Sequence, residues 1–141
     1  MRGMFAFAIW DTRQEKLFIA RDRLGIKPLY FATLDDGQFV FGSELKVLAT
    51  HPGLARRLDP LAVEDYFALG YVPEPRTIYR NVFKLLPGYT LTLSRKSAVP
   101  EPRQYWDISL RPGTTKPADV EHELIEAERA LDRLFAERRA D

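Results

Sequence analysis

The strongest constraint on the fold is a run of alternating residues near the start of the chain. Residues 3–11 read GMFAFAIWD, with apolar side chains on both faces of a two-residue period. This pattern predicts a strand that is buried between two layers. The polar run TRQEK interrupts the pattern, and LFIARD at residues 17–22 resumes it, which predicts a β-hairpin with a short connection. A hairpin of this kind favours a layered fold.

A dense group of charges follows the second predicted strand. In the run ARDRLGIKPLYF, the side chains of Arg21, Asp22 and Lys27 stand around a glycine and a proline. These residue types mark a tight turn before a third strand near residues 29–32. Taken alone, the charges are typical of a solvated loop whose ion pairs contribute little. Their position beside a buried hairpin favours the alternative, in which they have specific partners.

Two helices are expected in the middle of the chain. Ser43 precedes the apolar positions of ELKVLAT and is a suitable N-cap, with the helix ending near residues 51–53. Asp59 is expected to cap a second helix that has Pro60 at its first position and ends at Gly70.

The segment after the second helix, residues 71–89, combines prolines and glycines with scattered aromatic residues. It predicts an ordered loop draped over a surface, with Tyr71, Ile78 and Val82 as its anchors. The alternation of GYTLTLS predicts an edge-type strand, and RQYWDI at residues 103–108 predicts a last short strand.

The end of the chain differs in character from the rest. Residues 109–116, SLRPGTTK, are polar and turn-rich and predict a linker. Residues 117–139 predict an amphipathic helix. Its apolar positions recur at spacings of four and three: Val120, Leu124, Ala127, Leu131 and Leu134. The expected organisation is a domain at residues 1–108, a linker at 109–116 and a helical segment at 117–141.

Composition excludes several classes of function. The formal net charge is +1, so bulk electrostatics favour neither nucleic acid nor an anionic membrane as a partner. No apolar run is long enough to span a bilayer, and the default expectation is a cytoplasmic protein. The chain has no cysteine, hence no disulfide and no thiolate metal site. His51 and His122 are far apart, so no metal centre is expected.

Several linked motifs together resemble the glutamine-dependent asparagine synthetases. They are ARDRLGIKPLYF, FVFGSELKVLAT, LDPLAVEDYFALGYVPEPRTIYRNVFKLLPGYTLTL and RQYWDI, and they cover most of the chain in order. The run YVPEPRTIYRNVFKLLPG is most similar to the amidotransferases of bacterial exopolysaccharide or exosortase gene clusters. The resemblance implies an α+β fold, namely part of the four-layer α/β/β/α N-terminal-nucleophile hydrolase fold with antiparallel sheets, plus a C-terminal amphipathic helix.

The family is one of two-domain enzymes. The resemblance implies a class II amidotransferase domain whose terminal cysteine releases ammonia from glutamine, since a thiol beside an amine base is an activated nucleophile. A second domain activates aspartate, or a related acceptor, with ATP and magnesium. Residues 1–108 then correspond to the C-terminal half of the amidotransferase domain, and residues 117–141 lead into the synthetase domain.

By this comparison the chain is expected to be a fragment that lacks both active sites. It has no cysteine and no glycine-rich phosphate loop, and the family's glutamine-binding residues precede the GMFAFA strand. We therefore expect no catalytic, substrate-binding or metal-binding residue and no cofactor in this chain. ATP and magnesium are expected to bind the missing synthetase domain. Two alternatives are a split subunit or scaffold that completes a partner, and an interaction domain unrelated to nitrogen metabolism.

The charged turn is then expected to serve the interface between the amidotransferase and synthetase halves. The residues assigned to this interface are Arg21, Asp22, Gly25, Lys27 and Glu44. Glu44 could pair with Arg21 or Lys27, or it could be a solvent-facing helix carboxylate. Because an apolar stripe left in water is unfavourable, self-association or docking to a synthetase domain is also expected.

Overall fold

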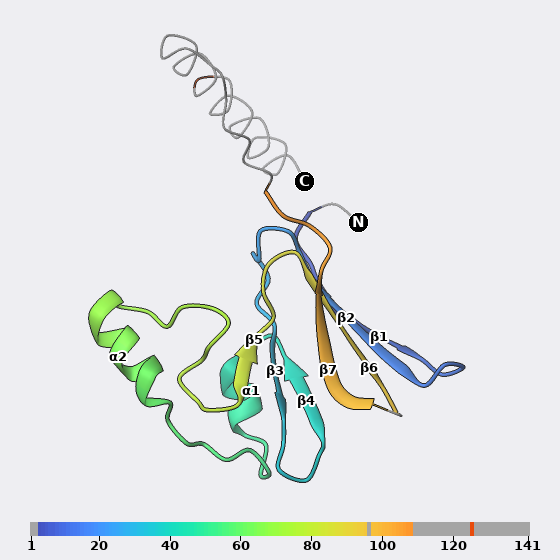
Figure 1. Ribbon diagram of the computed structural model, residues 1–141, viewed down its shortest axis with the longest axis horizontal. Helices are drawn as coiled ribbons and strands as arrows, with labels where there is room; N and C mark the ends of the chain where they lie inside the picture. The colour runs from blue at the N-terminus through green and yellow to red at the C-terminus, as the bar shows by residue number, and fades with distance from the viewer. Residues whose placement is uncertain (1–2, 96, 109–124, 126–141) are drawn as a thin grey trace. The chain divides into compact units, whose positions relative to one another are not determined.

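The computed structural model describes residues 3–95, 97–108 and 125 (Figure 1). The chain divides into two compact units, residues 1–107 and 108–141. The predicted linker and the predicted helix over residues 117–139 lie outside the described residues, apart from Ile125, which is helical.

The first sheet has four antiparallel strands in the order β1-β2-β6-β7. Their bounds are β1, Ala6–Asp11; β2, Lys16–Arg21; β6, Tyr89–Ser94; and β7, Ser97–Gln104. β1 and β2 form the predicted hairpin, and the polar run between them is the turn. β2 then pairs with β6 rather than with the next strand along the chain, which brings the two ends of the unit together.

The second sheet has three antiparallel strands in the order β4-β3-β5 (Figure 1). Their bounds are β3, Tyr30–Thr33; β4, Phe39–Gly42; and β5, Val82–Lys84. The third strand predicted from the sequence is β3. β5 lies within the segment that the sequence predicts to be an ordered loop, and it pairs with β3 across about fifty residues of intervening chain.

Two helices are present among the described residues. In α2, Pro60–Leu69, the Asp59 side chain accepts a hydrogen bond from the Leu61 backbone N–H at 3.1 Å, and Gly70 ends the helix in the left-handed conformation; both predictions are confirmed. α1, Leu45–Ala49, differs from its prediction, because Glu44 occupies the N-cap position and no side chain caps the helix. Neither described helix is long and apolar enough to cross a membrane.

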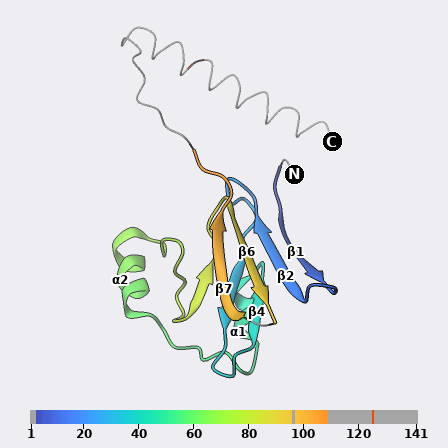
Figure 2. The same cartoon turned by 45° about the vertical axis from the view of Figure 1, so that its right-hand side comes forward.

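The two sheets pack face to face around one apolar cluster. Its buried members come from both sheets and from the segments that join them: Ile19, Leu29, Phe31, Leu85, Leu91 and Leu93. A second cluster, which includes Ala32, Leu48 and Val82, lies between the second sheet and α1. Because neighbouring residues of a strand point to opposite faces, Phe31 and Ala32 serve different clusters. The layers are therefore sheet, sheet and helix (Figure 2).

This arrangement is α+β with two antiparallel sheets and few helices, as expected for part of the N-terminal-nucleophile hydrolase fold. Two details of the strand predictions are wrong. β1, predicted to be buried on both faces, is an edge strand whose Ile9 is 56% exposed. β6, predicted to be an edge strand, lies between β2 and β7. Alternation along a strand shows which faces are apolar but does not show which neighbours it has.

The end of the unit also differs in detail. The last strand, predicted at residues 103–108, ends at Gln104 and begins at Ser97. Of the three anchors predicted in the loop, Val82 is fully buried and Ile78 is partly buried, whereas Tyr71 is exposed. Val82 is buried because it is a residue of β5, which pairs with β3, and its side chain packs in the cluster between the second sheet and α1.

Two isoleucines of the first sheet provide a matched test of this core. Ile19→Ala empties a site with no exposed surface between the sheets and is expected to lower the free energy of unfolding by about 2–5 kcal/mol. Ile9→Ala, on the exposed edge strand, is expected to change it by less than about 0.5 kcal/mol. Urea denaturation followed by circular dichroism measures both. Equal losses for the two variants would contradict the packing described here.

Candidate functional site

The turn that follows β2 is organised around the carboxylate of Asp22, which is only 1% exposed. Its Oδ1 accepts hydrogen bonds from the backbone N–H groups of Leu24 and Ile26, both at 3.1 Å. Its Oδ2 accepts from the backbone N–H groups of Lys27 at 3.0 Å and Phe5 at 3.3 Å. One side chain thus fixes most of the turn and attaches it to the residue before β1.

These contacts decide the ionisation of Asp22. Burial raises the pKa of the carboxyl, but the four backbone hydrogen bonds lower it by more, and the net pKa lies below the usual value of 3.8. The carboxylate is therefore charged at neutral pH, and backbone dipoles compensate its charge.

Arg21, 5% exposed, holds the other side of the turn. Its Nε donates to the Lys27 carbonyl at 2.9 Å, and its Nη2 donates to the Gly25 carbonyl at 2.7 Å. Nη1 donates to the Leu85 carbonyl and forms an ion pair with Glu74 at 3.0 Å. The guanidinium is planar and holds its N–H donors in fixed directions, so it can bond several acceptors at once. Through these bonds Arg21 joins segments more than fifty residues apart.

The network extends to the end of β7. The Tyr105 hydroxyl donates a hydrogen bond to the Arg21 carbonyl at 2.7 Å, and the Gly88 backbone N–H donates to the Asp22 carbonyl at 3.0 Å. Burial raises the pKa of Tyr105, the charge of Asp22 raises it further, and Arg23 opposes both. The Tyr105 hydroxyl is therefore protonated at neutral pH and is the hydrogen-bond donor in this contact.

Gly25 is required by this geometry. Its φ is +66°, which side-chain-bearing residues rarely adopt. A Cβ atom there would lie 2.7 Å from Cγ of Pro87 and 2.9 Å from Nη2 of Arg21. The glycine of the motif thus permits the close approach of the guanidinium.

The structure brings four of the five predicted interface residues together and separates the fifth. Arg21, Asp22, Gly25 and Lys27 share one turn, where the Lys27 side chain is exposed and the two other charges are buried. Glu44 pairs instead with Lys46, at 2.9 Å and in solvent. The suggested pairing of Glu44 with Arg21 is wrong, since Glu74 is the partner; the alternative of a solvent-facing carboxylate is confirmed.

The turn presents two apolar side chains to solvent beside the exposed Arg23 and Lys27. Leu24 is 66% exposed and Ile26 is 46% exposed. Arg23 lies beside them with its guanidinium carbon 5.9 Å from the ring centroid of Trp106. Sequence reasoning assigned importance to the charges and missed these two apolar residues, although both stand in the same motif.

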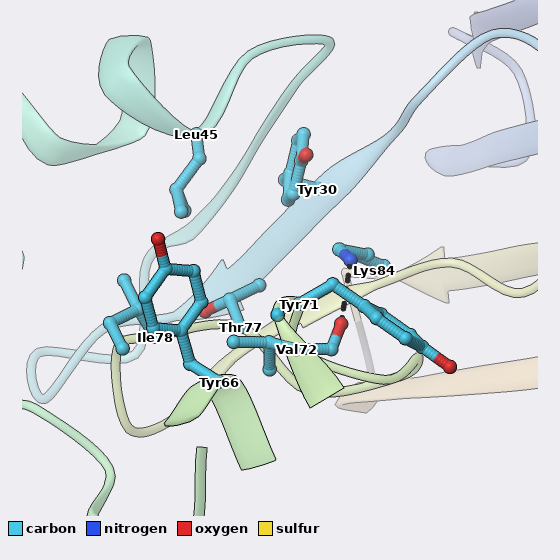
Figure 3. A pocket seen from close by; sticks show the side chains of 9 residues that line it. Tyr30, Leu45, Tyr66, Tyr71, Val72, Thr77, Ile78 and Lys84 are labelled. Atoms are coloured by element: carbon cyan, nitrogen blue, oxygen red, sulfur yellow. Dashed lines mark hydrogen bonds between the residues drawn. The ribbon is translucent and has the colours of Figure 1, made fainter. Parts of the chain in front are cut away.

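A pocket of about 500 Å³ lies on the face of the second sheet that packs against α1 (Figure 3). Its walls come from β3, α1, α2, β5 and the segment after α2: Tyr30, Leu45, Tyr66, Gly70, Tyr71, Val72, Thr77, Ile78 and Lys84. The Lys84 ammonium donates a hydrogen bond to the Val72 carbonyl at 3.2 Å (Figure 3). Tyr71 and Ile78 are among the predicted loop anchors, but no sequence pattern groups the other lining residues.

The described residues contain no group of three or more side chains that could hold a metal ion, and the chain has no cysteine to act as a thiol nucleophile. The side chains of Arg21 and Asp22 are engaged by backbone groups, which suits a structural role rather than proton transfer.

Comparison with known proteins identifies the class. The family model described as the glutamine amidotransferase domain matches residues 1–106. The chain therefore belongs to the glutamine amidotransferase domain family.

Three similar proteins have more specific names. The chain is 38% identical, over 77% of its length, to asparagine synthetase (glutamine-hydrolyzing) 3 of Bacillus subtilis (strain 168), and it covers 17% of that protein. It is 47% identical, over 62% of its length, to a putative asparagine synthetase (glutamine-hydrolyzing) of Mycobacterium tuberculosis (strain H37Rv), of which it covers 14%. It is 34% identical, over 92% of its length, to amidase chyE of Penicillium rubens, of which it covers 18%. The chain thus spans less than a fifth of each of these relatives.

Replacement of Asp22 tests the turn through its pH dependence. Because the folded-state pKa lies below the unfolded value, the stabilisation from the carboxylate is complete above about pH 4 and is lost as the pH falls through the folded pKa. At pH 7, Asp22→Asn is expected to cost about 2–3 kcal/mol, since it removes a charged acceptor of several hydrogen bonds. The difference between the variant and the parent chain should shrink below pH 4.

Asp35→Asn, at an exposed carboxylate, is the matched control and should change stability by less than about 0.5 kcal/mol. Urea denaturation between pH 3 and pH 7 makes the measurement. A difference between Asp22→Asn and the parent chain that stays constant over this range would show that the charge of Asp22 does not stabilise the turn.

Proposed function

We propose that this chain is the structural part of a glutamine amidotransferase domain, in an ATP-dependent, glutamine-hydrolysing enzyme of the asparagine synthetase type. The observation that supports this most directly is a family match over residues 1–106 in a chain without cysteine. The relatives named as glutamine-hydrolysing asparagine synthetases support the reaction class.

The thiol nucleophile must then come from outside residues 1–141. Glutamine hydrolysis by this family requires an activated cysteine, and these residues have none. The nucleotide-binding site must likewise come from outside residues 1–141. The sequence has no glycine-rich phosphate loop, and the described residues offer no cluster of metal ligands. ATP and magnesium are assigned to a synthetase domain, and no catalytic step is placed on the residues described here.

The contribution of the chain is to present a rigid surface. The turn after β2 is fixed by the buried Arg21 and Asp22, and its exposed Leu24 and Ile26 offer apolar contact area that needs no reorganisation on binding. We assign this surface to the interface with the synthetase half. The alternative, a split subunit or scaffold that completes a separate partner, uses the same surface and is favoured by the same exposed residues.

A glutaminase assay tests the proposal for the chain alone. The purified 141-residue protein is expected to release no more ammonia from glutamine than a sample without protein. Pretreatment with iodoacetamide is the control, since it inactivates any contaminating thiol amidase and cannot alkylate a cysteine in this chain. Iodoacetamide-resistant ammonia release that scales with the concentration of the chain would contradict the proposal.

Co-purification tests the interface. The chain should be co-expressed with a polypeptide that carries the cysteine-bearing segment and the synthetase domain of the asparagine synthetase type. Leu24→Ser combined with Ile26→Ser is expected to reduce the recovered complex at least about tenfold, because two exposed apolar anchors are lost. Val47→Ser, at an exposed apolar residue of α1, is the matched control and should leave recovery unchanged. Equal recovery of the complex with the Leu24→Ser/Ile26→Ser variant and with Val47→Ser would show that the interface lies elsewhere.

A further inference from the structure

We propose that the pocket between α2 and the second sheet binds a small carboxylate with an aromatic body. The proposal goes beyond the amidotransferase function and does not depend on it. It rests on the size of the pocket, its aromatic and aliphatic walls, and the sign of the charge in it.

The pocket has the dimensions and the lining of a ligand site. Its volume of about 500 Å³ lies within the range of about 300–1,000 Å³ that ligand pockets occupy. Leu45, Val72 and Ile78 supply aliphatic surface, and three tyrosine rings supply flat aromatic surface. Figure 3 shows the Tyr66 ring between Ile78 and Leu45, with its hydroxyl directed at Leu45. Aromatic rings pack against one another in stacked or edge-to-face geometry, so a planar apolar body suits these walls.

The polar groups of the pocket select an anion. Lys84 is its one charged lining residue, and no aspartate or glutamate lines it. One ammonium proton of Lys84 is used by the Val72 carbonyl, which leaves two for a ligand. The hydroxyls of Tyr30 and Tyr66 have no hydrogen-bond partner within the described part of the chain and can donate as well. A donor-rich lining of this kind is complementary to a carboxylate.

Nearby acidic side chains do not compete for the lysine. Asp65 of α2 forms an ion pair with Arg76, and Glu74 forms an ion pair with Arg21. Both carboxylates are thus held by arginines, and neither lines the pocket. The positive charge of Lys84 therefore lies beside an apolar cavity and has no compensating side-chain charge. A bound carboxylate would supply this negative charge.

The walls of the pocket are held by contacts that do not involve a ligand. The Asp59 backbone N–H donates to the Ile78 carbonyl at 2.9 Å and joins the start of α2 to the far wall. The Lys84 backbone N–H donates to the Pro75 carbonyl at 2.7 Å, and the buried Thr77 hydroxyl donates to the Val82 carbonyl at 2.9 Å. The backbone at the start of α2 and around β5 is therefore fixed by the fold without a ligand.

Indole-3-acetate is a suitable probe, with indole-3-acetamide as its neutral counterpart of the same shape. Titration of the full chain, followed by two-dimensional amide NMR, is expected to give saturable shifts at residues of the pocket. The acid should bind about tenfold more tightly than the amide, because a charge-assisted hydrogen bond is lost in the amide. Equal affinities for the acid and the amide, or no saturable shifts, would overturn the proposal.

Two variants localise the site and distinguish specific from non-specific binding. Lys84→Met keeps the apolar stem and removes the charge, and it should weaken binding of the acid about tenfold while leaving the amide unaffected. Lys46→Met, at an exposed lysine outside the pocket, is the matched control and should bind like the parent chain.

Leu45→Trp adds a second test that does not depend on the Lys84–Val72 contact. The larger side chain fills the cavity and should abolish binding of both probes, with retention of the folded NMR spectrum as its control. Retention of acid binding in this variant would place the ligand elsewhere. If both probes bind with equal affinity and Leu45→Trp abolishes both, the pocket is an apolar docking groove for a protein side chain, and the carboxylate assignment is wrong.

Discussion

The rest of the unit depends on one pair of neighbouring buried charges. Asp22 and Arg21 lie at the end of β2 and together gather the start of the described chain, the turn, the segment before β6 and the end of β7. A buried charge is costly unless it is fully hydrogen-bonded. Here backbone groups of the turn and of distant segments satisfy both charges, together with the Glu74 carboxylate. The cost of leaving either charge unpaired makes this one arrangement of the segments strongly preferred over alternatives.

The function of the turn follows from this division of roles. Arg21 and Asp22 are buried, whereas Leu24 and Ile26 face the solvent beside the exposed Arg23 and Lys27. A loop with its backbone groups and charges committed internally loses little conformational freedom when a partner binds its exposed side chains. This is why we place the proposed interface on Leu24 and Ile26 rather than on the buried Arg21 and Asp22.

The face of the second sheet next to α2 is less completely covered than the face that packs on the first sheet. α2 contributes Ala62 alone to the buried residues, stands beside the sheets in Figures 1 and 2, and is held by the Asp65–Arg76 ion pair and the contact of Asp59 with Ile78. An open pocket and exposed apolar residues such as Phe67 result. Exposed apolar surface next to a cavity is typical of a site that receives another molecule, and Lys84 gives that site its sign of charge.

The sequence by itself determined the local features of this protein: the hairpin, β3, the Asp59 cap and the Gly70 stop of α2, and the amidotransferase family. The structural features depend on residues close together in the chain, where alternation, capping and turn preferences act directly. The family resemblance depends on motifs that follow one another along most of the chain. Only the tertiary structure decided that β6 is central, that Val82 belongs to a strand, that Glu74 rather than Glu44 neutralises Arg21, and that Tyr30, Tyr66 and Lys84 line one pocket. Those outcomes join residues many positions apart, and long-range pairing is set by the packing of whole layers, which no local pattern records.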